Sequence, residues 1–315
     1  MRDVLVRAGA ATGRGIRTVC SPTGIRGTAV EFAWTAAHLA TYPLGVARER
    51  ASEATRSDLY TLAGLPPVQR GLLLGDVEAA GTPILLIHGI MDNRSVFTLL
   101  QRGLSRRGFG RVRTLNYQVF THDIRSAARR LAAEVEQLAV DSGHERIHVI
   151  GHSLGGLIAR YYVQRLGGDE RVHTVVTLGS PHAGTQLARL APGRLLRQLR
   201  PDSDVIAELA EPAPGCRTRF VAFWTDLDGV ILPKHSARID HPDLAARNIF
   251  VRGVGHLSMP IHRQVIHEIC STLAHLDSDG GLRTAGVTNI SSSPTPGPSR
   301  LRRLTRPARR ADSAG

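Results

Sequence analysis

The chain has 315 residues, of which 42% are hydrophobic and 21% are charged, proportions typical of a soluble globular protein. The formal net charge is +13, and arginine supplies nearly all of the positive charge because Lys234 is the only lysine. Three widely spaced cysteines form no metal-ligand pattern, and the chain contains no dinucleotide-binding glycine pattern or phosphate loop. We therefore expect no metal and no cofactor. We also expect no nucleic-acid partner, because no nucleic-acid-binding module is recognisable.

The first 65 residues are predicted to form an N-terminal helical extension, with helices over 30–40 and 47–62 and an end at Pro66-Pro67. Charged side chains interrupt residues 1–27, so no apolar core of a signal peptide is apparent. Residues 29–46 are apolar but too polar and too short for a membrane span. These features predict a cytoplasmic protein, or one that contacts a membrane peripherally.

Residues 66–282 alternate between short apolar runs and amphipathic stretches. Strands are predicted at 83–88, 112–117, 147–150, 172–178, 219–224 and 248–251. Helices are predicted at 95–106, 123–140, 261–276 and from the turn at Ser153 to about Leu166. This alternation predicts an α/β domain whose mostly parallel central sheet is covered by helices on both faces.

Two segments depart from this alternation. Leucines and arginines mix over residues 186–216, which predicts short amphipathic helices in a cap insertion. Residues 283–315 are rich in Arg, Pro and Ser and contain too few apolar residues to form a core, so we expect a disordered tail. The arginines of the tail would attract an anionic membrane surface, although a solvated tail needs no partner to explain it.

The sequence around Ser153 has the most specific chemical pattern in the chain. Gly151-His152-Ser153-Leu154-Gly155 lies between a predicted strand and a predicted helix. A sharp turn there forces the serine into a sparsely populated backbone conformation, and glycine at 151 and 155 lets the strand and the helix approach each other. The hydroxyl then projects from the sheet at a helix N-terminus, where developing negative charge is favoured. The pattern predicts a nucleophilic serine.

A serine nucleophile needs a base and an acid that orients the base. His256 follows the last predicted strand in Gly-Val-Gly-His, where two glycines let the ring reach across the sheet. Asp226 and Asp228 both follow the strand over 219–224. We place the acid at Asp228, since the extra residues let the chain clear the sheet before it turns. Asp226 remains the alternative, and a turn-forming aspartate that caps a backbone N–H would also explain it.

These motifs resemble those of the α/β-hydrolases. Gly-His-Ser-Leu-Gly-Gly, His88-Gly89-Ile90, Asp228-Gly-Val, Gly-Val-Gly-His256 and the stretch 180–185 are similar to lipase motifs, in the same order, within about residues 80–275. The resemblance implies the α/β-hydrolase fold and a Ser153-Asp228-His256 triad. It also implies an oxyanion hole formed by the backbone N–H groups of Leu154 and Ile90. We expect the stretch 178–185, which contains the motif at 180–185, to have a structural role in the pocket wall, because Ser180 lacks the elbow geometry.

The resemblance further implies a serine hydrolase like the small bacterial triacylglycerol lipases or carboxylesterases, acting on a small-molecule ester or lipid. Met91, Phe97 and Leu257, together with the leucines of the cap, are expected to line an apolar acyl site, although core packing explains each of them equally well. The same machinery would also suit a thioesterase, an amidase or an acyltransferase. A vestigial site would leave a non-catalytic lipid-binding module.

Overall fold

The computed structural model describes residues 81–90, 94–115 and 123–274. The predicted N-terminal helices, Met91, the arginine-rich tail and the domain boundaries near residues 65 and 283 lie outside these ranges. The cap insertion and all five motifs, from His88 to His256, lie within them.

In the described ranges, six parallel strands form one sheet, in the order β2-β1-β3-β4-β5-β6. The strands are β1 Ile84–Ile87, β2 Val112–Leu115, β3 Ile147–His152, β4 Val172–Leu178, β5 Arg219–Thr225 and β6 Ala245–Val251. Every residue of β1 and β3 is buried, as expected of apolar runs covered on both faces. Because all pairings are parallel, the residues that follow the strands emerge at one edge of the sheet.

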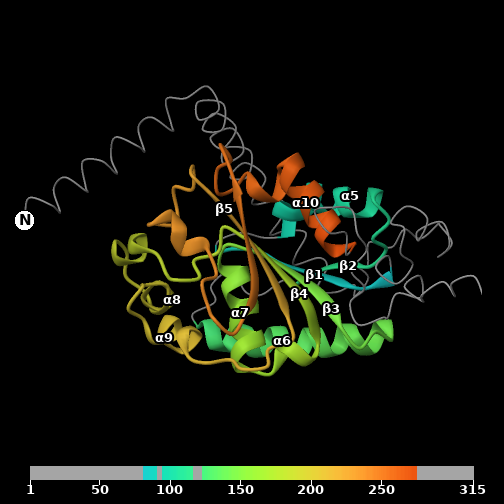
Figure 1. The fold of residues 1–315 in the computed structure, drawn as a ribbon, viewed down its shortest axis with the longest axis horizontal. Coiled ribbons are helices and arrows are strands. Elements are labelled where there is room, and N and C mark those ends of the chain that lie inside the picture. Colours follow the sequence, from blue (N-terminus) through green and yellow to red (C-terminus); the bar gives the residue numbers. More distant parts are fainter. Residues whose placement is uncertain (1–80, 91–93, 116–122, 275–315) are drawn as a thin grey trace, which may run out of the picture. The chain divides into compact units, whose positions relative to one another are not determined.

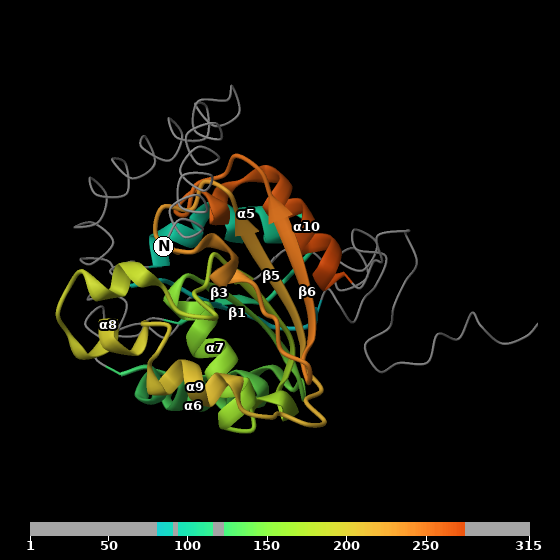
Figure 2. The same ribbon diagram turned by 60° about the vertical axis from the view of Figure 1, so that its left-hand side comes forward.

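Helices cover both faces of this sheet (Figures 1 and 2). The helices α6 (Ile124–Ser142) and α7 (Leu154–Arg165) pack on one face, and α5 (Thr98–Arg106) and α10 (Arg263–Leu273) pack on the other. The predicted stripe of α6 is buried along its whole length, which confirms this helix. Two apolar clusters, one on each face of the sheet, therefore make up the core.

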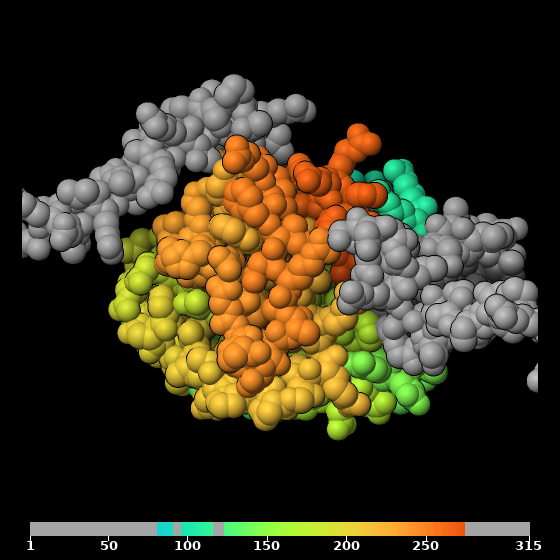
Figure 3. Space-filling view, in the orientation of Figure 1, coloured from blue at the N-terminus to red at the C-terminus, as the bar shows by residue number. Residues whose placement is uncertain are grey.

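The last strand and the last helix differ from their predicted bounds. β6, an edge strand of the sheet (Figure 3, orange), begins three residues before the predicted start at 248, because Ala245, Ala246 and Arg247 include no large apolar side chain. The closing helix is shorter than the predicted 261–276: a 3-10 turn, η5 (Met259–Ile261), precedes α10, which ends at Leu273. The 3-10 turn η1 (Arg94–Phe97) likewise opens the helix that was predicted from 95.

The cap insertion consists of three short helices: η3 (Gln186–Arg189), α8 (Arg194–Gln198) and α9 (Asp204–Ala210). The short amphipathic helices predicted for this segment are thus confirmed. Their apolar side is buried, since Leu195, Leu199 and Leu209 join the core cluster on the α6 and α7 face. Most of the cap leucines therefore anchor the cap to the domain.

Ionic contacts also attach the cap to the domain. Arg125, on the first turn of α6, pairs with Asp204 and Glu208 of α9, and the hydroxyl of Tyr161 on α7 donates to Glu208 at 2.5 Å. The hydrogen bond from Arg125, opposed by partial burial and assisted by the bond from Tyr161, holds the pKa of Glu208 below its ordinary value of 4.5. Glu208 is therefore ionised at neutral pH and joins three helices.

We expect Glu208→Gln to lower the free energy of unfolding by about 1 kcal/mol at pH 7, roughly 2–4 °C in Tm. Because the folded-state pKa of Glu208 is lowered, its contribution is complete above the unfolded-state value and is lost as the pH falls through the folded-state value. The difference in Tm between wild type and variant should therefore shrink at pH 3. Thermal unfolding at both pH values tests this. Glu136→Gln, which breaks an exposed pair with Arg171, is the control and should cost less.

Candidate active site

Ser153, Asp228 and His256 all follow carboxyl ends of strands. Ser153 comes directly after β3, Asp228 three residues after β5 and His256 five residues after β6. The parallel sheet therefore brings residues that are distant in the sequence to one edge, and all three are buried to 94% or more.

The turn at Ser153 has the strained geometry that the glycine pattern predicts. Ser153 has φ 53° and ψ −121°, and it is the only non-glycine residue with positive φ in the described ranges. A Cβ at Gly151 would lie 2.4 Å from the backbone of Gly156, and one at Gly155 would lie 2.3 Å from the carbonyl oxygen of Ile87. A hydrogen bond of 2.9 Å from the Ser153 N–H to the Leu178 carbonyl joins the turn to β4. The strain is thus held by close packing of strand and helix.

Asp228 and His256 form a buried, directly hydrogen-bonded pair. His256 Nδ1 lies 2.8 Å from Asp228 Oδ2, and the side chains are 4% and 2% exposed respectively. The other carboxylate oxygen of Asp228 accepts backbone N–H bonds from Val230 and Ile231, each at 2.8 Å. Burial alone would raise the pKa of Asp228, but the charge and hydrogen bond of His256 and the two backbone donors lower it below 3.8.

This pairing determines which nitrogen of His256 can act as a base. An ionised carboxylate only accepts hydrogen bonds, so Nδ1 of His256 carries the proton that Asp228 accepts. The lone pair of the neutral ring is then on Nε2. The arrangement is that of a histidine held in one tautomer by an aspartate, which leaves Nε2 able to accept a proton.

Asp226, the alternative acid, makes different contacts. Its Oδ1 accepts the backbone N–H of Gly253 at 2.9 Å, and the neighbouring Thr225 hydroxyl donates to the Val254 carbonyl at 2.7 Å. Both bonds hold the loop that leads to His256. Asp226 thus has the backbone-capping role that its turn position allowed, and the structure brings Asp228, not Asp226, to the imidazole.

His152 also belongs to the candidate site, although the sequence analysis did not select it. Its ring is fully buried, its centroid lies 5.0 Å from that of the His256 ring, and its Nε2 donates to the His256 carbonyl at 3.1 Å. The residue before Ser153 therefore packs directly against the ring of His256. Its position beside Ser153 was the only signal in the sequence.

Gly179 lies against the pair from the loop after β4. Its φ is +56°, and a Cβ there would lie 3.0 Å from His256 Nδ1 and 3.1 Å from Asp228 Oδ2. The loop over 179–185, expected to shape the pocket wall, thus begins in contact with both side chains. Arg160 of α7, 5% exposed, supports the same loop by donating to the His182 carbonyl at 3.2 Å and to the Leu209 carbonyl of the cap at 2.9 Å.

We expect Gly179→Ala to reduce ester hydrolysis at least about tenfold, because the methyl group must push apart a hydrogen-bonded pair. The matched control is Gly167→Ala. Gly167 has a similar φ of +72° but no atom within 4 Å of the Cβ position, so it carries the backbone strain without the contact. The Gly167→Ala variant should therefore lose about 1 kcal/mol of stability and keep the kcat of wild type. Equal kcat losses in the two variants would contradict the role given to Gly179.

The remaining predicted site residues are distributed as follows. Leu154, buried, opens α7 directly after Ser153, and Ile90, half-buried, follows β1, the strand next to β3. Leu257 is half-buried beside His256, whereas Phe97 is fully buried in the core between the sheet and α5 and α10. Met91 lies outside the described residues. Leu154 and Ile90 thus lie at adjacent strand ends, as the oxyanion prediction requires, while Phe97 has no exposed surface.

Comparison with families and solved structures identifies the fold. A family model described as the alpha/beta hydrolase fold matches residues 82–211. Lipase BlEst2 of Bacillus licheniformis, in its mature form, superposes with a TM-score of 0.54 at 16% identity, over 62% of this chain and 92% of that one. Lipase B of Aspergillus fumigatus superposes with a TM-score of 0.56 at 15% identity, over 67% and 55%. The chain therefore has the α/β-hydrolase fold, as predicted.

Two curated bacterial proteins are similar in sequence. The triacylglycerol lipases of Pseudarthrobacter phenanthrenivorans and Burkholderia plantarii are each 30% identical over 114 residues, 34% of this chain. The match spans 35% and 31% of their lengths, so the chain covers about a third of each relative. The chain thus resembles bacterial lipases in sequence as well as in fold. Separately, none of the helices in the described ranges is long and apolar enough to cross a membrane.

Proposed function

We propose that the protein is a serine hydrolase that cleaves carboxylic esters through Ser153, His256 and Asp228. The observation that carries the proposal is the buried 2.8 Å hydrogen bond between His256 and Asp228, at the sheet edge where Ser153 occupies a strained strand-to-helix turn. A buried carboxylate that orients an imidazole, at the same sheet edge as a serine in a strained turn, supports activation of that serine. The fold and the similarity to lipases support an ester as the substrate.

In this mechanism the Ser153 hydroxyl attacks the ester carbonyl while Nε2 of His256 takes its proton. Asp228 stabilises the imidazolium that forms. The backbone N–H groups of Leu154 and Ile90 donate to the tetrahedral oxyanion, each lowering the barrier by about 3 kcal/mol. His256 then protonates the departing alcohol. Water, deprotonated by the same imidazole, releases the acid from the acyl-enzyme.

We propose a lipid ester, such as an acylglycerol, as the substrate class. The relatives named triacylglycerol lipase support this choice. Met91 and Leu257 are proposed to line the acyl site, Met91 because it follows Ile90 in the sequence and Leu257 because it adjoins His256; Phe97 would support its floor from within the core. Because lipid esters are presented at surfaces, peripheral contact with a lipid surface is part of this proposal.

A series of p-nitrophenyl esters from acetate to palmitate, with and without an emulsion surface, tests the proposal. We expect turnover of esters, with a preference for medium or long acyl chains that the emulsion increases. Product analysis with added alcohol distinguishes hydrolysis from acyl transfer, and matched thioesters and anilides are assayed in parallel. Turnover of a thioester or anilide with no cleavage of any ester would overturn the assignment to ester hydrolysis.

A further inference from the structure

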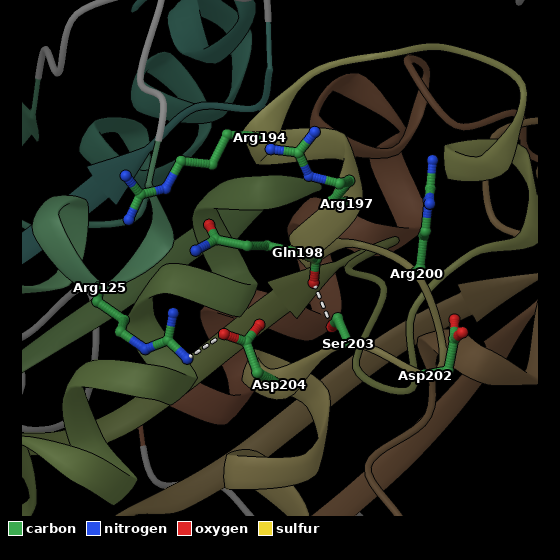
Figure 4. Close-up of a pocket in the computed structure, with 8 residues that line it drawn as sticks. All are labelled: Arg125, Arg194, Arg197, Gln198, Arg200, Asp202, Ser203 and Asp204. Carbon is green, nitrogen blue, oxygen red and sulfur yellow. Dashed lines mark hydrogen bonds and ion pairs between the residues drawn. The ribbon is translucent and has the colours of Figure 1, made fainter.

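A polar pocket of about 560 Å³ lies between the cap and the N-terminus of α6 (Figure 4). All of its lining side chains are polar or charged, and four of them are arginines: Arg125, Arg194, Arg197 and Arg200. Its volume suits a small-molecule ligand, but no apolar residue lines it to hold an acyl chain. The pocket therefore requires a ligand chemistry different from that of the proposed acyl site.

The charges around this pocket do not balance. Arg125 pairs with Asp204 and Glu208, and Arg194 pairs with Asp123 at 2.6 Å. The other acid of the pocket, Asp202, pairs at 2.7 Å with Arg189.

Within the described residues, Arg197 and Arg200 have no ion pair with a carboxylate. Arg200 makes only a 3.3 Å hydrogen bond, to the Ala188 carbonyl. Because Arg125 is shared by two carboxylates, the five arginines of this region exceed its four acids by one positive charge, which favours an anionic ligand.

The arrangement of the side chains supports a compact anion. Arg194, Arg197 and Gln198 project to one side of the cap, the side on which Arg125 lies, while Arg200 extends in a different direction (Figure 4). Planar guanidinium groups donate in pairs to phosphate oxygens, and Gln198 NH₂ can add a neutral donor. We propose that this pocket binds a phosphate-bearing ligand, held mainly by Arg197 and Arg194. Arg200 adds to the positive electrostatic potential of the pocket.

A ligand there would contact two parts of the domain. Arg197 belongs to α8 of the cap and Arg125 to α6, so an anion between them would add an ionic contact that holds the cap to the domain. The base of the cap is itself bonded to the loop after Asp228, through Thr185 Oγ1 to the Val230 carbonyl at 2.9 Å. This ligand site is independent of the proposed catalytic residues, so binding can be measured whether or not Ser153 is a nucleophile.

The test compares two double variants of the full chain that lose the same charge. Arg197→Gln/Arg200→Gln alters the pocket, whereas Arg102→Gln/Arg263→Gln alters exposed arginines of α5 and α10 on the opposite face of the sheet. Calorimetry measures binding of inorganic phosphate and of glycerol 3-phosphate. Sedimentation measures binding to vesicles of phosphatidylcholine alone, with phosphatidylglycerol, or with oleate as a carboxylate of matched charge. The arginine-rich tail is present in every protein, so its attraction to vesicles cancels in the comparison.

We expect the pocket variant to bind phosphate ligands at least tenfold more weakly than wild type and the control variant to bind as wild type does. Binding of the soluble phosphates shows that the ligand is a free phosphate compound. A loss of binding in the pocket variant that is confined to phosphatidylglycerol vesicles identifies a lipid headgroup. The proposal is overturned if no phosphate ligand binds to wild type, if both double variants lose binding equally, or if the pocket variant loses as much binding to oleate vesicles as to phosphatidylglycerol vesicles.

Discussion

Replacing Ser153 by alanine is expected to reduce ester hydrolysis by a factor of roughly 10⁴ or more, to the level that the oxyanion donors and substrate binding alone supply. The change removes the only atom that forms the covalent intermediate, so kcat falls rather than KM rising. Steady-state kinetics on a soluble p-nitrophenyl ester measures both parameters. Wild-type turnover in this variant would show that another group attacks the ester.

Substitutions of Ser153 should change the stability of the protein much less than its activity, and the sign should depend on the backbone strain. Ser153 makes no side-chain capping bond to α7, so alanine loses little, but alanine keeps the unfavourable φ of 53°. Glycine relieves that strain. Glycine also raises the conformational entropy of the unfolded chain, which offsets part of this gain. We therefore expect Ser153→Gly to be about 1 kcal/mol more stable than Ser153→Ala, and both variants to be inactive. Chemical denaturation of the two variants measures the difference. Equal stability would show that the strained turn costs nothing.

Asp228→Asn is expected to lower kcat by roughly 10³ to 10⁴, because the amide no longer holds His256 in the tautomer that has Nε2 free to act as a base. Asp226→Asn is the matched control, two residues away with the same change of charge. Its amide oxygen can still accept the N–H of Gly253, so kcat should fall less than about tenfold.

Comparing the kcat values of these two variants decides between the acids that the sequence left open. A larger loss of kcat for Asp226→Asn than for Asp228→Asn would show that Asp226, not Asp228, is the acid. The pH dependence of kcat adds a second readout: a merely structural effect of Asp228→Asn would lower kcat without changing the profile, whereas loss of the orienting carboxylate should change both.

Local patterns predicted most of the fold, as well as Asp228 and His256, which the structure joins by a hydrogen bond. The strands around Ser153 are apolar on both faces, and their buried runs are visible without any partner. The turn at Ser153 was predictable because backbone crowding permits only glycine at 151 and 155, a constraint written in adjacent residues. The start of the edge strand β6 was harder to predict, since its first three residues, 245–247, include no large apolar side chain.

The contacts that support the site are long-range and had no local pattern. Gly179 lies against His256 only because the loop after β4 crosses the sheet edge, and His152 meets the same ring across a sequence separation of 104 residues. Arg160 reads in the sequence as one more arginine in an arginine-rich chain, yet it is buried between α7 and the cap. The cap acids pair with Arg125, and Arg197 has no ion pair within the described residues. This distribution likewise depends on which helices the fold brings together.

Covalent labelling tests the central claim most directly. The full chain is incubated with a fluorophosphonate, digested and analysed by mass spectrometry. If Ser153 is the activated nucleophile, a single adduct should appear on the peptide that contains it, at a rate that Asp228→Asn greatly reduces and Asp226→Asn leaves nearly unchanged. Labelling of a different residue, or none at Ser153 in a folded protein that hydrolyses esters, would contradict the account.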